Sequence, residues 1–120
     1  MNRTAKSQTD HDTLVKRVVN HLEEKGYRNI CADLAGYTRP ELIEGTKQDH
    51  IPDVTADGVI VEVETADSVS SDHTASQFYL FADHAAKNGK EFWVVVPKGV
   101  DRAAKQRLDV LGINAEVYTA

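Results

Sequence analysis

A chain of 120 residues has the usual length of one domain, and its 41% hydrophobic and 28% charged residues are ordinary for a globular protein, which excludes a disordered chain. No apolar run approaches the roughly 18 residues that a membrane span requires, and Cys31 is the only cysteine, so we expect a soluble, cytoplasmic protein without an internal disulfide or a cysteine-based zinc site. The net charge of −5 opposes a general affinity for phosphate backbones, so a nucleic-acid substrate would need basic residues gathered on one face or supplied by a partner chain.

Hydrophobic spacing and turn residues divide the chain, which we expect to form a single domain over 1–120, into eight elements. A flexible polar leader is predicted over 1–9, and Thr9-Asp10 is predicted to cap a first helix that ends at Gly26. The later elements are strands over 27–34, 51–56 and 59–65, a helix over 71–88, a strand over 91–97, a helix over 100–111 and a strand over 113–119. This order, α-β-β-β-α-β-α-β, predicts an α/β fold with a central mixed sheet flanked by helices, closed by right-handed parallel crossovers.

Three segments carry further signals about burial. The connection over 36–50 is polar and contains Pro40, with one helical turn expected at 40–43. The uninterrupted apolar run over 92–96 indicates a strand covered on both faces. The helix over 71–88 has an apolar stripe formed by Ala75, Phe78, Tyr79, Ala82, Ala85 and Ala86.

Asp57-Gly58 is a strong signal for a two-residue hairpin between the strands over 51–56 and 59–65. With these two residues in the turn, Asp53 lies opposite Glu62. Side chains alternate between the faces of a strand, so Asp53, Glu62 and Glu64 are expected on one face and the valines of the hairpin on the other. We expect the valine face to pack in the core and the acidic face to look toward a cleft.

The acidic face predicts a metal site. Directly opposed like charges destabilise a sheet unless something neutralises them, and oxygen ligands favour Mg²⁺ or Mn²⁺ over zinc. The backbone carbonyl of Val63, between Glu62 and Glu64, is a candidate further ligand. The alternative is that the hairpin simply turns an acidic side to solvent.

The sequence resembles the PD-(D/E)XK nuclease superfamily. The resemblance lies in Pro52-Asp53, followed after eight residues by Glu62-Val63-Glu64, and in Gln77-Phe78-Tyr79-Leu80-Phe81 on the next helix, which is similar to the Gln-x-x-x-Tyr motif of RecB-type nucleases. It implies a restriction-endonuclease-like fold, similar to that of small Holliday-junction resolvases. Gln77 and Phe81 are expected to share a helix face off the main apolar stripe.

The resemblance also implies residue roles. Asp53 and Glu62 would hold the metal, which activates water and polarises the scissile phosphate. Gln77 would orient the cluster or contact a phosphate, although it is also a reasonable polar position on a partly buried helix. Glu64 stands where the family has lysine, so this chain either uses Glu64 as a general base or second-metal ligand or has lost catalysis.

Several other residues are candidates for the site but also have a purely structural interpretation. His73 and Thr74 begin the second helix, where they suit either phosphate binding or capping. Glu23 and Glu24 could extend the metal shell or be surface charges. Other cations could replace the missing lysine or lie on the surface: Arg39, Lys47 and Lys90.

Three functions remain open from the sequence. The leading hypothesis is a Mg²⁺- or Mn²⁺-dependent endo- or exodeoxyribonuclease that acts on DNA as a homodimer or as a subunit of a larger complex. The second is a catalytically degenerate nuclease-fold module that binds metal, nucleic acid or protein. The third is a structural protein whose acidic face is ordinary surface.

Overall fold

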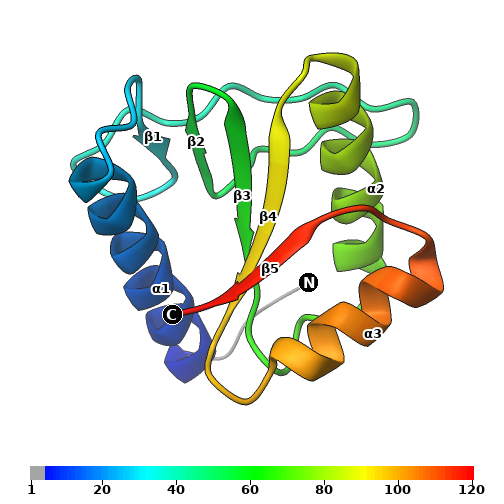
Figure 1. Ribbon diagram of the computed structural model, residues 1–120. Coiled ribbons are helices and arrows are strands. Elements are labelled where there is room, and N and C mark those ends of the chain that lie inside the picture. Colours follow the sequence, from blue (N-terminus) through cyan, green and yellow to red (C-terminus); the bar gives the residue numbers. More distant parts are fainter. Residues whose placement is uncertain (1–4) are drawn as a thin grey trace.

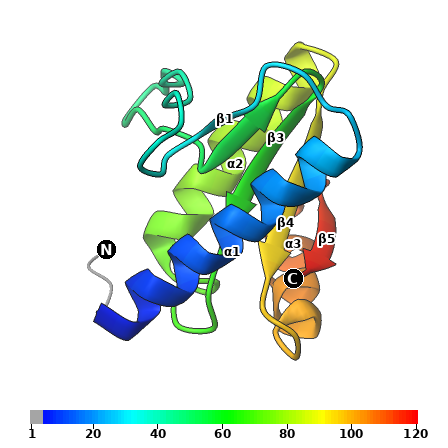
Figure 2. The ribbon, with the colours of Figure 1, turned by 90° about the vertical axis from the view of Figure 1, so that its left-hand side faces the viewer.

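A five-stranded mixed sheet lies between helices on both of its faces (Figures 1 and 2). This computed structural model describes residues 5–120, in the order α1 (Ala5–Glu24), β1 (Cys31–Ala32), β2 (Val54–Ala56), β3 (Val59–Val63), α2 (Asp72–Lys87), β4 (Glu91–Val96), α3 (Asp101–Leu111) and β5 (Glu116–Thr119). The predicted α/β class and element order are confirmed.

The strands are arranged in the order β1-β2-β3-β4-β5. β1 with β2 and β2 with β3 pair antiparallel, whereas β3 with β4 and β4 with β5 pair parallel, as predicted for strands that are joined through helices. The hairpin has the predicted register, with Val54 opposite Val61 and Ala56 opposite Val59. Gly58 has a φ of 81°, which a two-residue turn requires and which glycine adopts without strain.

Successive side chains of β3 point to opposite faces of the sheet, and each face packs in its own hydrophobic core. Val59, Val61 and Val63 pack with the apolar stripe of α1 on one face, and Ile60 packs with α2, α3 and the alternate residues of β4 on the other. Figure 2 shows α1 in front of the strands with α2 and α3 behind them. The valine face is core, as predicted, but the opposite face is also covered, so the acidic residues do not face open solvent.

The predicted leader over 1–9 is wrong for the part that the structure describes. α1 begins at Ala5, so Thr9 and Asp10 lie inside the helix and do not cap it. Ser7 is buried and its hydroxyl donates to Asp67 Oδ1 at 3.1 Å. The beginning of the helix is therefore fastened to the loop that follows β3, which composition alone could not show. Residues 1–4 lie outside the described residues.

Two predicted segments are largely irregular. Of the strand expected over 27–34, only Cys31–Ala32 pairs, because Asn29 has a φ of 57° and turns the chain away from an extended course. No helical turn forms at 40–43 in this described segment; Ile43 and His50 instead form an isolated antiparallel bridge with backbone bonds of 2.8 and 3.1 Å.

The buried face of α2 is rotated from the predicted one. Tyr79, expected in the apolar stripe, is 50% exposed and its hydroxyl donates to the carbonyl of Leu111. Phe81, expected off the stripe, is fully buried and packs edge-on against Phe92 of β4. α2 packs on the sheet through the face that carries Phe78 and Phe81. Because a surface helix has one buried face, Tyr79 is left on the exposed side.

None of the three helices within residues 5–120 has both the length and the apolar character needed to cross a membrane.

The corrected helix start leads to a stability prediction. Ser7→Ala removes a donor to Asp67 and a contact with Thr65 in a buried setting, so we expect it to cost about 1–2 kcal/mol and to lower the melting temperature by about 4–8 °C per kcal/mol. Calorimetry provides the measurement. Thr9→Ala is the control, because Thr9 is exposed and bonds the backbone of its own helix. Equal melting of Ser7→Ala and wild type would restore the leader hypothesis for residues 5–9.

Candidate functional site

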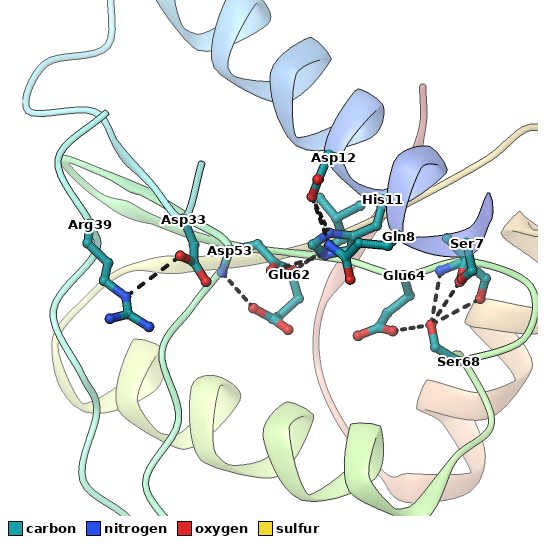
Figure 3. A network of polar contacts seen from close by, with 12 residues as sticks. Ser7, Gln8, His11, Asp12, Asp33, Arg39, Asp53, Glu62, Glu64 and Ser68 are labelled. Carbon is teal, nitrogen blue, oxygen red and sulfur yellow. Dashed lines mark hydrogen bonds and ion pairs between the residues drawn. The ribbon is translucent and has the colours of Figure 1, made fainter. Parts of the chain in front are cut away.

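The predicted carboxylates lie in one small pocket beside the end of β3 (Figure 3). Its volume is about 220 Å³. The sheet side contributes Asp33, Asp53, Glu62 and Glu64, followed by Ser68 in the next loop. The helices contribute Gln8 and His11 from α1 and His73, Thr74 and Gln77 from α2.

Asp53 and Glu62 interlock across the beginning of the hairpin. The Asp53 N–H donates to Glu62 Oε1 at 2.9 Å, and the Val63 N–H donates to Asp53 Oδ2 at 2.8 Å. Asp53 lies just before β2, and extending the observed Val54–Val61 register by one residue matches it with Glu62. The hydrogen bonds bring the two residues together, and each carboxylate is held by a backbone N–H of the facing segment.

The Glu62 side chain is deeply buried, at 2% exposure. Its pKa is raised well above the ordinary value for glutamate, first by burial and then by the negative charges of Asp53 and Glu64. The hydrogen bond from the Asp53 N–H acts in the opposite direction. The negative charges of Asp53 and Glu64 thus act against ionisation of Glu62, in addition to the larger effect of burial.

Glu64 is also buried and is held by the loop that follows β3. The Ser68 hydroxyl donates to Glu64 Oε2, and the Thr65 N–H donates to Ser68 Oγ at 3.0 Å. Because Ser7 contacts Thr65 from α1, the first turns of that helix and the position of Glu64 depend on one connected network. Figure 3 shows this network beside the Asp53–Glu62 pair.

His11 is a pocket residue that the sequence analysis did not single out. Its Nε2 lies 3.1 Å from Asp53 Oδ1 and its Nδ1 lies 3.4 Å from Asp12 Oδ1, while the ring is buried. A signal was present: His11 precedes Leu14 and Val15 by three and four residues, so it continues the apolar stripe of α1 by one turn. A histidine on a buried stripe needs a polar partner, and the partner here is the candidate metal ligand.

The remaining predicted site residues have different outcomes. Gln77 is half-buried and lines the pocket. The Val63 side chain packs in the α1-side core and its N–H bonds Asp53; metal ligation by its carbonyl stays a prediction. His73 and Thr74 line the pocket, but Ser71 is the cap of α2 and accepts the Thr74 N–H at 3.1 Å.

Other candidates lie apart from the pocket. Glu23 and Glu24 are exposed at the far end of α1 and do not line it. Lys47 and Lys90 line different hollows. Arg39 approaches only the margin, with its Nε 3.6 Å from Asp33 Oδ1. Among the described residues that line the pocket, none is lysine or arginine.

Within residues 5–120, no group of three or more His, Cys, Asp or Glu side chains is arranged to hold a metal ion. Comparison with protein-family models, curated proteins and solved structures found no match for this chain. A functional interpretation therefore depends on the pocket itself.

Glu62→Gln provides a test of the repulsion. The pKa of Glu62 is higher in the folded protein than in the unfolded chain. As the pH rises above the ordinary glutamate pKa, ionisation of Glu62 therefore favours the unfolded chain and lowers the stability of the fold. Glutamine has no such ionisation and keeps an acceptor for the Asp53 N–H. We expect Glu62→Gln to melt higher than wild type at pH 8, with the difference shrinking toward pH 4.5, in calorimetry without added metal.

Glu24→Gln is the matched control because it removes one carboxylate from the exposed surface of α1. It should melt close to wild type, within about 0.5 kcal/mol, at both pH values. The assigned repulsion would be contradicted if Glu62→Gln melted no higher than wild type at pH 8. It would also be contradicted if the difference in melting temperature grew as the pH was lowered.

Proposed function

We propose that this protein is a divalent-metal-dependent hydrolase of phosphodiester bonds in DNA, with a restriction-endonuclease-like fold of the PD-(D/E)XK type. The observation that carries the proposal is the buried Glu62, whose charge is opposed by Asp53 and Glu64 in a pocket that holds all three carboxylates. Such an arrangement costs stability, and perturbed carboxylates in a pocket are typical of functional sites. The order of the helices and strands supports the proposed fold.

The donor set agrees with a Mg²⁺- or Mn²⁺-type ion. Magnesium in proteins is commonly held by one or two carboxylates, with waters and substrate phosphates completing its coordination. Asp53 and Glu62 supply two carboxylates, so a third protein group is not required. Their observed hydrogen bonds leave room for a metal, because each carboxylate oxygen has two lone pairs.

In this proposal Asp53 and Glu62 hold the ion, with the Val63 carbonyl as the predicted further ligand. The bound ion would supply an activated water and polarise the scissile phosphate. Positive charge close to Glu62 would also favour its ionised form and offset the repulsion within the pocket.

The other pocket residues have roles that do not require them to bind the ion. In this proposal Glu64, which accepts a hydrogen bond from Ser68, takes a proton from the attacking water. Gln77 and Thr74 on α2 form the polar wall opposite the carboxylates and are suited to orient a phosphate oxygen. Glu64 does not supply the positive charge that lysine gives at this motif position, so we expect slow catalysis.

A second function has a specific observation in its favour. The residues that line the pocket include neither lysine nor arginine, and cations of this kind stabilise the charge that develops in phosphoryl transfer. The same fold is therefore also suited to a non-catalytic module that binds metal, nucleic acid or protein. A homodimer or a larger assembly would reconcile the two functions by bringing cations from another chain.

Metal binding is tested separately from catalysis. A metal ion that binds only the folded state, present at a hundred times its dissociation constant, stabilises that state by about 2.7 kcal/mol. At about 4–8 °C per kcal/mol, this corresponds to a rise in melting temperature of about 11–22 °C. We expect wild type to show such a shift with Mn²⁺ and Glu62→Ala to lose it, in calorimetry. Glu24→Ala, on the exposed surface of α1, should retain it. The metal site is rejected if wild type and Glu62→Ala respond equally.

Catalysis is tested with the same proteins and Mn²⁺ on single-stranded, duplex and branched DNA. We expect slow cleavage by wild type and by Glu24→Ala, and at least a hundredfold less cleavage by Glu62→Ala. Mn²⁺ binding without cleavage would favour the non-catalytic module. Cleavage that persists in Glu62→Ala would assign the activity to another site or to a contaminant.

A further inference from the structure

We propose that His11 of α1 is a positioning residue that orients Asp53 as a metal ligand. This inference rests on the proposed metal site and adds a residue that the family motifs do not contain. It starts from the 3.1 Å contact between His11 Nε2 and Asp53 Oδ1.

Asp53 is fixed from two sides. The Val63 N–H holds Oδ2 from the neighbouring strand, and His11 meets Oδ1 from the helix (Figure 3). With one contact the carboxylate could rotate about its bond to Cβ, whereas with two its plane is set. Metal-ligating groups are usually oriented in this way by hydrogen bonds from residues that do not touch the metal.

His11 is itself held firmly, which a positioning residue requires. Its side chain is 10% exposed, and it lies one turn before Leu14 and Val15, which pack in the core under α1. On its other side, Asp12 Oδ1 lies 3.4 Å from Nδ1 and also accepts the Gln8 amide at 2.9 Å. A chain of polar contacts therefore runs from the surface of α1 to Asp53.

The attachment of α1 to the loop after β3 also helps to hold His11 in position. Ser7 contacts Thr65 and Asp67 one turn before His11, so the part of the helix that carries His11 is attached to the sheet at the site. Helix ends fray when their first turns are not held. Without the Ser7 contacts, fraying of the first turns of α1 would allow His11 to move.

The test measures affinity for Mn²⁺ alone, by isothermal titration calorimetry, and needs no substrate. His11→Ala removes the donor, and His11→Gln keeps an N–H at similar reach. His21→Ala is the matched control because His21 lies on the same helix, exposed and outside the pocket. Melting without metal, followed by circular dichroism, verifies that each variant is folded. Should His11→Ala not fold, His11→Leu takes its place as the variant without the donor.

We expect His11→Ala to bind Mn²⁺ about 10–100-fold more weakly than wild type, the usual effect of losing such a contact. His11→Gln should recover most of this loss, and His21→Ala should match wild type. A purely structural role would not be rescued by the amide in this way. Unchanged affinity of His11→Ala, or His11→Gln as weak as His11→Ala, would overturn the assignment. No Mn²⁺ binding by wild type would instead remove the metal site and the proposed function together with this inference.

Discussion

The central constraint on this structure is the buried carboxylate of Glu62, which lies against Asp53 beside the β2–β3 hairpin. Two carboxyl groups are brought together where little water reaches them, and they accept hydrogen bonds from backbone N–H groups of the facing segment, while His11 contacts Asp53 from α1. Burial and the neighbouring charges of Asp53 and Glu64 raise the pKa of the Glu62 carboxyl well above its ordinary value. An apolar residue at this position would stabilise the fold, and this cost in stability is the reason for the proposed metal site.

The rest of the fold holds this pair in place. β3 is the middle strand of the sheet, and alternation sends Val61 and Val63 into the core beneath α1 while Glu62 points to the side of α2. A shift of the hairpin by one residue would move the valines to the α2 side and bury the acids in the α1 core, so hydrophobic packing fixes the register that the acidic pair needs. Of the carboxylates in the pocket, Glu62 lies within β3, whereas Asp53 and Glu64 lie at the ends of β2 and β3.

α1 contributes in two ways, through residues of one helical stripe. Leu14, Val18 and Leu22 cover the valine face of the sheet, whereas His11, one turn earlier, approaches Asp53. Packing of the helix therefore carries its first turns to the pocket. An otherwise acidic cavity thereby gains a hydrogen-bond donor from a distant part of the chain.

The sequence by itself determined the order of the helices and strands and the register of the hairpin. Helical spacing, the Gly58 turn and the alternation of valine with acid are local patterns, and local patterns set secondary structure and the face on which a side chain lies. These were enough to place Asp53 opposite Glu62. They also predicted that the strand over 92–96 is covered on both faces, and Trp93 within it is 8% exposed.

Only the tertiary structure decided what surrounds the carboxylates. Whether Glu62 faces water or protein depends on α2 lying over that face of the sheet, and the same packing determines that Phe81 is buried while Tyr79 is exposed. The contact of His11 with Asp53 joins residues far apart in the chain. Spacing within one segment carries no information about such a contact, because it arises from the way separate elements pack around a shared core.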